Sequence, residues 1–333
     1  MAFLVQSLFK YMVPMMLVAL AGVFAERSGI INIALDGMMI FGSFIGALFV
    51  YILQADKYGI QLAIENGQGQ WIFLAAMLIA AVAGGLFSLL LAFSAINLKA
   101  DQTIGGTALN LLAPAISLFF IDMICSQQYM NMPYGTTNWF LVRNEGLQGT
   151  IGEWFFDRMY ISTYIAFALF ILLALWLYKT KTGLRLRSCG EHPQAADSVG
   201  ISVKKMRYLG TTISGMLGGL GGYIYVVCSA NGAVQGDVQG VGFIALAIMI
   251  FGNWKPGGIA LGAFLFGLLR CISATYAQLD INGDGVCLLA NLGLPGYFYN
   301  ILPYVAVLIV LIFTAGKSRC PKAEGIPYDK GQR

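Results

Sequence analysis

Charged residues are scarce in this sequence, and their scarcity excludes an ordinary soluble protein. Asp, Glu, Lys and Arg account for only 11% of the 333 residues, whereas soluble domains carry about a quarter. Hydrophobic residues account for 58%, and no polar stretch is long enough to fold into a domain of its own. The net charge of +4 is too small to indicate nucleic-acid binding. The composition therefore predicts a membrane protein.

Residues suited to catalysis or metal binding are equally few. The sequence has one histidine, His192, and its cysteines form no CxxC pair, so the usual zinc motifs are absent. HExxH and GxSxG are absent too. AGKS at 315–318 lacks the first glycine of a phosphate-binding loop, where Leu311 stands, and DINGDG at 280–285 lacks the last glutamate of a calcium loop, where Asn291 stands. We therefore expect no catalytic residue, metal site or cofactor in this chain.

Long apolar runs indicate how the chain crosses the membrane. A helix needs about 20 apolar residues to span a bilayer, and on that basis we expect about nine helices. They lie roughly at 3–25, 30–54, 72–97, 103–125, 159–179, 205–228, 239–252, 256–275 and 297–315. The seventh is short and predicts a partial span. The fold class is thus all-α, a polytopic membrane helical bundle.

Lysine and arginine set the expected orientation, because they concentrate in loops on the cytoplasmic side of a membrane. With the 180–204 loop placed in the cytoplasm, strict alternation of the helices leaves only Lys57, Arg143 and Arg158 in outer loops. Most of the 20 Lys and Arg then lie inside. The distribution predicts an external N-terminus and a cytoplasmic C-terminus.

The chain divides into one membrane domain, 1–316, and a short cytoplasmic tail, 317–333. The longest external segment, 126–158, is rich in aromatic side chains: Tyr129, Tyr134, Trp139, Trp154, Phe155 and Phe156. Two explanations stay open for them. They form an interfacial belt at the membrane surface, or they form a surface that receives a soluble partner.

The sixth predicted helix carries glycines at helical spacing. Gly215 and Gly219 are four residues apart, as are Gly218 and Gly222. Small residues at this spacing let helix backbones approach closely in lipid, where packing drives association. We expect this helix to pack tightly against its neighbours.

Few polar residues lie at membrane depth. Asn32 and Asp36 are four apart and share one face of the second predicted helix, and Asn110 lies in the fourth. Such groups either face a cavity for a neutral, hydrogen-bonding solute or bond helices to one another. Asp122 and Arg270 lie near external helix ends, where they snorkel to the surface or pair with each other. The lack of a buried acidic or histidine relay argues against an ion-coupled carrier.

The loop TGLRLRSCGEHPQAADSVG at 182–200 is basic and soluble between two apolar stretches. Proline is favoured as the first residue of a helix and glycine just after its end, so this loop predicts a short helix with a small apolar knob. Such a helix suits docking into a cleft on another protein, and a merely solvated loop is the alternative. The residues concerned are Glu191, Pro193, Ala195, Ala196, Asp197 and Gly200.

Four stretches together resemble the permeases of bacterial nucleoside ATP-binding-cassette importers, within the group that serves branched-chain amino acids and ribose. They are ERSGIINIALDGMMIFGSF (26–44), QTIGGTALNLLAPAI (102–116), the 182–222 segment and GVGFIALAIMIFGNWKPGGIALGAFLFG (240–267). The resemblance covers nearly the whole chain except 126–158 and the tail.

The resemblance implies one half of a transmembrane pair, similar to the shorter of two permeases that form a heterodimer. It also implies a cytoplasmic ATPase that binds ATP and magnesium, and an external substrate-binding lipoprotein. It assigns the residues of the 182–200 loop to an ATPase-coupling helix, and Asn32, Asp36 and Asn110 to the substrate pathway. Asp36 departs from the glutamate usual at that position, although the carboxylate is kept.

We therefore expect a permease that moves nucleosides across the bacterial cytoplasmic membrane by alternating access. Riboflavin, a sugar or a related solute is the alternative cargo for the same machine. An ATP-independent nucleoside carrier and a structural membrane scaffold are the alternatives from other classes, the first favoured by a pH-sensitive, essential Asp36.

Overall fold

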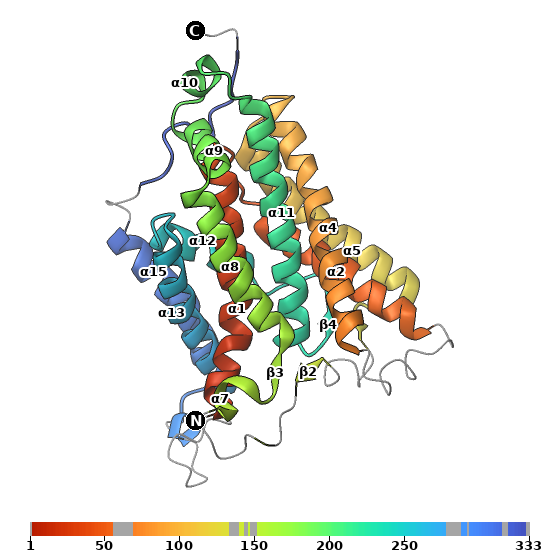
Figure 1. Ribbon diagram of the computed structural model, residues 1–333. Helices are drawn as coiled ribbons and strands as arrows, with labels where there is room; N and C mark the ends of the chain where they lie inside the picture. Colours follow the sequence, from red (N-terminus) through yellow and green to blue (C-terminus); the bar gives the residue numbers. More distant parts are fainter. Residues whose placement is uncertain are drawn as a thin grey trace.

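The computed structural model describes residues 2–55, 69–132, 140–142, 146, 152–277, 288–291, 293–314 and 319–330. It is almost entirely helical (Figure 1). The helices are α1 Ala2–Arg27, α2 Leu35–Ala55, α4 Gly69–Ile96, α5 Gln102–Cys125, α7 Glu153–Phe156, α8 Ile161–Lys179, α9 Lys181–Glu191, α10 Pro193–Ser198, α11 Val203–Cys228, α12 Val241–Phe251, α13 Pro256–Thr275, α14 Leu288–Asn291 and α15 Gly296–Thr314. The two-residue strands are β1 Met130–Asn131, β2 Leu141–Val142, β3 Met159–Tyr160 and β4 Ala233–Val234.

Seven of the described helices are long and apolar enough to cross a membrane, and α12 and α15 contribute two shorter apolar segments. Together these match the nine helices expected from the sequence, and the partial span predicted over 239–252 is confirmed by α12. Its 11 residues extend only ~16 Å, about half the thickness of a bilayer core. The chain is a multi-pass membrane protein.

The bundle has two distinct ends, which we name after the elements that lie there. At the α10 end, the last residue of α1 contacts the last residue of α9, and the start of α11 contacts Asn97 after α4. At the strand end, Gln6 near the start of α1 donates to the carbonyl of Asp157, and β1 pairs antiparallel with β4 as β2 does with β3. Figure 1 shows α9, α10 and the C-terminus at one end and the N-terminus, β2 and β3 at the other.

Two non-helical stretches enter the bundle from opposite ends. Residues 28–34 follow α1 from the α10 end, and residues 229–240 follow α11 from the strand end. Each leads to a helix that begins inside the bundle, α2 in the first case and α12 in the second. α1 therefore runs from the strand end to the α10 end, whereas α11 runs the opposite way (Figure 1).

The centre of the bundle is built on α1 and α11, whose spanning segments are 83% buried, against 22% for α5 and 28% for α8. The glycine spacing in α11 explains its position. A Cβ on Gly219 would lie 2.4 Å from the carbonyl oxygen of Ala80 in α4, and one on Gly222 would lie 2.1 Å from that of Met39 in α2. The close helix packing expected from these glycines is confirmed.

Two details of the sequence prediction are wrong. The second helix was expected over 30–54, but it begins at Leu35, so Asn32 lies in the preceding non-helical stretch and shares no helix face with Asp36. The sequence also predicted a single short helix within 180–204, whereas α9 precedes it. Thr180 caps α9 by accepting a hydrogen bond from the backbone amide of Gly183 at 3.1 Å.

The 126–158 segment is described only in part. Tyr134 and Trp139 lie outside the described residues. Phe155 and Phe156 of α7 are exposed, and the ring of Phe155 also lies 6.2 Å from that of Phe9 in α1. This placement fits either explanation offered for the aromatic residues of this segment.

Candidate transport path and coupling surface

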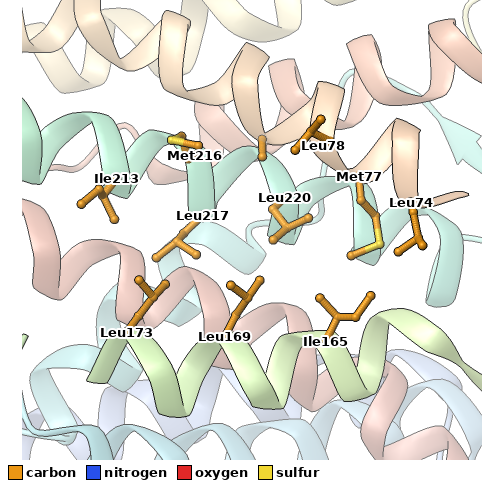
Figure 2. A pocket seen from close by; sticks show the side chains of 11 residues that line it. Leu74, Met77, Leu78, Ile165, Leu169, Leu173, Ile213, Met216, Leu217 and Leu220 are labelled. Carbon is orange, nitrogen blue, oxygen red and sulfur yellow. The ribbon is translucent and has the colours of Figure 1, made fainter. Parts of the chain in front are cut away.

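One groove of the bundle offers no chemistry to a polar solute. It lies between α4, α8 and α11, has a volume of about 360 Å³, and is lined by aliphatic and methionine side chains such as Leu74, Leu169 and Met216. Figure 2 shows that its lining carries only carbon and sulfur. Any site for a hydrogen-bonding solute therefore lies elsewhere in the bundle.

The two helices that begin inside the bundle meet at Asp36. Asp36 lies in the first turn of α2, and its Oδ1 accepts a hydrogen bond of 2.9 Å from the backbone amide of Gly242 in the first turn of α12. Backbone amides at a helix N-terminus carry a partial positive charge, so the carboxylate is well matched to α12. A Cβ at Gly242 would lie 2.5 Å from the backbone nitrogen of Asp36, so this contact requires glycine. We call it the Asp36–Gly242 junction.

Asn110 of α5 fixes the start of α2 beside this junction. Its Oδ1 accepts from the backbone amide of Gly37 at 2.7 Å, and its Nδ2 donates to the carbonyl of Ile33 at 2.9 Å. These bonds are the interhelical alternative left open by the sequence. The side chain also keeps part of its surface exposed.

Asn32 has no exposed surface. Its Nδ2 donates to the Oγ of Ser214 in α11 at 2.8 Å and lies 3.4 Å from the Sδ of Met38. Its Oδ1 is buried without a partner among the described residues. The side chain attaches the non-helical 28–34 stretch to α11, and Asn32, Asp36 and Asn110 all lie around the start of α2.

The short helix predicted around Pro193 is present as α10, with Pro193 in its first turn. Gly200 follows it with a φ of +84°, the left-handed conformation that favours glycine after a helix. Glu191 ends α9 and forms an ion pair of 3.2 Å with Arg27 of α1. Asp197 lies 4.0 Å from Lys330 of the tail. The flanking acidic residues thus attach α9 and α10 to the rest of the chain.

The two alanines of α10 have different environments. Ala195 is exposed, whereas Ala196 is 3% exposed and packs with Cys189 of α9 and Val203 of α11. The apolar knob expected from both alanines is therefore formed differently. Val199, which is 74% exposed, stands beside Ala195 at the tip, and Ala196 holds the helix in place.

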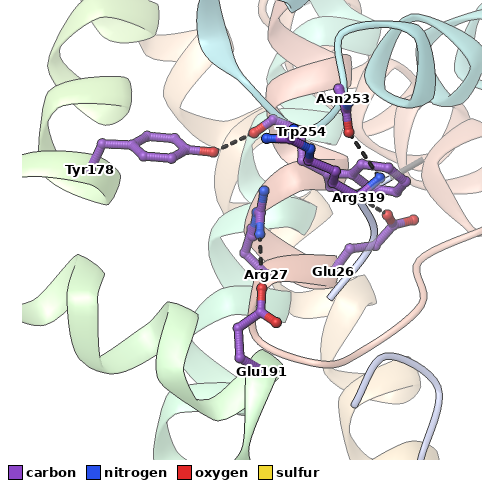
Figure 3. A network of polar contacts seen from close by, with 7 residues as sticks. All are labelled: Glu26, Arg27, Tyr178, Glu191, Asn253, Trp254 and Arg319. Carbon is purple, nitrogen blue, oxygen red and sulfur yellow. Dashed lines mark hydrogen bonds and ion pairs between the residues drawn. The ribbon is translucent and has the colours of Figure 1, made fainter. Parts of the chain in front are cut away.

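A polar network closes the α10 end. The indole nitrogen of Trp254 donates to the carboxylate of Glu26, and the hydroxyl of Tyr178 donates to the carbonyl of Trp254. Figure 3 shows these contacts together with the Arg27–Glu191 pair, which links α1 to α9. The network joins α1, α8, α9 and the residues after α12. It therefore attaches α9 to the bundle in addition to the Thr180 cap in its first turn.

The C-terminal tail, 319–330, lies across this end. The amide of Ala323 donates to the carbonyl of Gly190 at 2.9 Å. The buried guanidinium of Arg207 donates from Nη1 to the carbonyl of Ile326 at 3.0 Å. Burial raises the pKa of Glu324 to about 7, against the lowering effects of a hydrogen bond to Glu26 and of Arg27. The tail thus contacts α9, α11 and the carboxylate of Glu26 in α1.

Two polar pockets open toward the strand end, and neither was found from the sequence. One, of about 670 Å³, lies at the end of α5 beside Asp122 and Tyr129. The other, of about 570 Å³, lies between α1, α11, α13 and α15 and is lined by Asp237, Arg270 and Tyr304, among others. Arg270 donates to the side-chain oxygen of Gln239. The Asp122–Arg270 pair considered from the sequence is not among the ion pairs of the described residues.

The described part of the chain contains no group of three or more His, Cys, Asp or Glu side chains placed to hold a metal ion. The buried polar groups of the described residues are instead carboxylates, amides, hydroxyls and the guanidinium groups of Arg207 and Arg270. Such groups suit hydrogen bonding with a neutral solute.

Comparison with known proteins places this chain among permeases. The family model described as "Branched-chain amino acid transport system / permease component" matches residues 4–313. The guanosine ABC transporter permease protein NupQ of Bacillus subtilis is 38% identical over 333 residues, covering 99% of this chain and 97% of the relative. The nucleoside ABC transporter permease protein NupC of Lactococcus lactis is 35% identical over 329 residues, covering 99% and 97%.

A third relative is more distant. The guanosine ABC transporter permease protein NupP of Bacillus subtilis is 26% identical over 264 residues, covering 78% of this chain and 71% of the relative. No solved structure matches the chain.

Proposed function

This chain belongs to the branched-chain amino acid transport system permease family, and on that premise we propose that it is the membrane subunit of an ATP-driven importer of nucleosides. We infer the cargo from the similarity, over nearly the full length of both chains, to one permease named for guanosine and another named for nucleosides. As a permease component it is a transport subunit and not an ATPase. ATP and magnesium belong to its partner.

The complex contains three other kinds of subunit. A cytoplasmic ABC ATPase supplies the energy, and an external substrate-binding lipoprotein delivers the solute. A second permease completes the membrane pair. The pairing is supported by two guanosine permeases of one organism, NupQ and NupP, both of which are similar to this chain.

The α10 end faces the cytoplasm of the bacterial cell, and the strand end faces outward. Basic residues support this orientation, because they gather at the cytoplasmic side. Those described at or near the α10 end are Arg27, Lys99, Lys179, Lys181, Arg185, Arg187, Lys204, Lys205, Arg207, Lys255, Arg319, Lys322 and Lys330. Only Lys10, Arg158 and Arg270 are described in the opposite half. The C-terminus is then cytoplasmic.

The solute passes the Asp36–Gly242 junction on its way through. Asp36 and Asn110 border the path, and Asn32 keeps the 28–34 stretch in place behind them. The meeting of two helices that begin inside the membrane supports this, since transporter sites are commonly built from discontinuous helices. A single carboxylate and amide groups suit a neutral solute with many hydroxyl and amine groups.

Coupling to the ATPase occurs through α10. Ala195 and Val199 form the exposed tip that enters a cleft on the ATPase, and Ala196, Glu191, Pro193, Asp197 and Gly200 shape the helix and attach it to the bundle. The tail and the Arg27–Glu191 pair support this role, because they join the tip to α1 and α11, the most buried helices.

Transport by the reconstituted complex tests this function. The chain is purified with its copurifying permease and ATPase, inserted into liposomes and supplied with its binding protein. We expect labelled guanosine to accumulate with internal ATP and not with ADP, and riboflavin and glucose to remain outside. Accumulation without ATP would replace the proposal by a carrier acting alone. ATP-dependent uptake of riboflavin or glucose alone would keep the machine and change its cargo.

A further inference from the structure

The second strand-end pocket, which we call the Asp237 pocket, combines a suitable size with varied polar chemistry. Its volume of about 570 Å³ lies within the ~300–1,000 Å³ typical of small-molecule sites. One anion, Asp237, and one cation, Arg270, line it, so their charges balance. The other polar groups are hydroxyls and amides: Tyr11, Tyr225, Ser229, Gln239, Ser273, Asn300 and Tyr304. This balance favours a neutral ligand over an ion.

The polar groups of the pocket are held in place by the protein. Arg270, which is 8% exposed, donates to the side chain of Gln239. The hydroxyl of Tyr304 donates to the carbonyl of Gln239 at 2.9 Å. Asp237 accepts from the backbone amide of Gln239 at 2.8 Å through Oδ1. A site whose groups are fixed in advance loses little entropy when a ligand binds.

Two exposed residues complete the wall formed by α15. Asn300 accepts from the hydroxyl of Ser273 at 3.0 Å through Oδ1, which directs its amide nitrogen toward other acceptors. Tyr304 is 41% exposed and lines the pocket. Aromatic rings stack on the flat faces of nucleobases, and carboxylates accept hydrogen bonds from paired sugar hydroxyls.

We propose that the Asp237 pocket binds the nucleoside before it reaches the Asp36–Gly242 junction. Asp237 accepts hydrogen bonds from the ribose 2′- and 3′-hydroxyls, the ring of Tyr304 stacks against the base, and Asn300 bonds the base edge. This inference rests on the proposed function and deepens it by naming the site of recognition.

The position of the pocket along the chain supports this role. Asp237 and Gln239 lie on the non-helical 229–240 stretch, and Gly242 of the junction follows two residues after it. The segment that lines the pocket therefore leads directly into the junction.

Equilibrium binding to the purified complex in nanodiscs, without the binding protein, tests the site. Tritiated guanosine and its 2′,3′-dideoxy analogue are the probes. Because a hydrogen bond to a charged group contributes about 1.5–3 kcal/mol, Asp237→Asn is expected to weaken guanosine binding about ten-fold or more. The same variant is expected to leave binding of the dideoxy analogue unchanged, since the hydroxyls are missing.

Two further variants sharpen the test. Tyr304→Ala is expected to weaken the binding of both probes alike, because both carry the base. Asp122→Asn removes a carboxylate at the same end but in the other pocket, and it is expected to leave the binding of both probes unchanged.

Equal binding of guanosine by wild type and Asp237→Asn would overturn the site, as would an equal loss for both probes or an equal loss in Asp122→Asn. ATP-driven guanosine uptake that persists in such a case would leave the proposed function standing. A wild-type complex that transports riboflavin or glucose but no nucleoside would overturn both.

Discussion

The two ends of the bundle use their polar side chains differently. At the α10 end, Glu26, Arg27 and Asn253 all bond to other parts of the same chain, and the tail lies over them. At the strand end, Asp237 and Tyr304 line an open cavity of about 570 Å³. Polar side chains thus hold segments of the chain together at the α10 end and line a cavity at the strand end.

The same difference extends to the helices that begin inside the bundle. A hydrogen bond between Asn32 and Ser214 attaches the stretch before α2 to α11, whereas the stretch before α12 carries the exposed Asp237 and Gln239. The Asp36–Gly242 junction lies where the two meet. Substitutions at the junction, in α10, in the tail and at Glu191 test whether the junction and the α10 end are as tightly built as the structure indicates.

The largest effect is expected at the junction itself. Gly242→Ala places a Cβ 2.5 Å from the backbone of Asp36, and overpacking of this kind costs about 1–3 kcal/mol. We expect nucleoside uptake to fall more than about ten-fold, as measured in proteoliposomes. Gly257→Ala is the matched control, since a Cβ there meets nothing within 4 Å. Normal uptake by Gly242→Ala would show that α2 and α12 separate freely.

The next effect distinguishes the two alanines of α10. Ala195→Asp alters an exposed tip, so we expect it to abolish stimulation of the ATPase by loaded binding protein while thermal unfolding of the complex stays unchanged. Ala196→Asp places a charge among Cys189 and Val203, so we expect it also to lower the unfolding temperature. Full coupling in Ala195→Asp would remove α10 from the ATPase interface.

The third effect concerns the tail and pH. The pKa of Glu324 rises from its ordinary 4.5 to about 7 when the tail is docked, chiefly through burial. A raised pKa means that docking is strongest below about pH 4.5 and weakens as pH rises through about 7. We expect hydrogen exchange at Ala323 and Gly325, corrected for intrinsic rates, to speed up over this window.

Glu324→Gln provides the comparison for the tail. The amide cannot ionise, so the pH dependence of exchange at these two residues is expected to disappear. If the variant retained the same dependence, another group would have to be responsible for it.

The smallest effect is expected for the Arg27–Glu191 pair. The side chain of Glu191 is 42% exposed, and ion pairs in such positions contribute about 0–1 kcal/mol. Glu191→Gln should therefore change the free energy of unfolding by about 1 kcal/mol or less, measured by chemical denaturation in detergent. A much larger loss would mean that this pair holds α9 in place, rather than the tail and the Trp254 network.

The sequence predicted the fold class, the helices and the short α10 well, because each depends on local composition. Apolar runs fixed the spans, and Pro193 and Gly200 marked the limits of α10. Local pattern gave the wrong result at Asn32, since a non-helical stretch inside a membrane protein can have the same apolar composition as a helix. It also treated Ala195 and Ala196 as equivalent, although burial distinguishes them.

The amino-acid sequence by itself thus determined that this chain crosses the membrane repeatedly, where it does so, and that its basic residues collect at one end. Only the tertiary structure decided which polar residues meet. Asp36 and Gly242 are 206 positions apart, and Asp237, Arg270 and Asn300 come from three separate segments. Their meeting depends on how the whole bundle packs, and no local pattern records which residues that packing brings together.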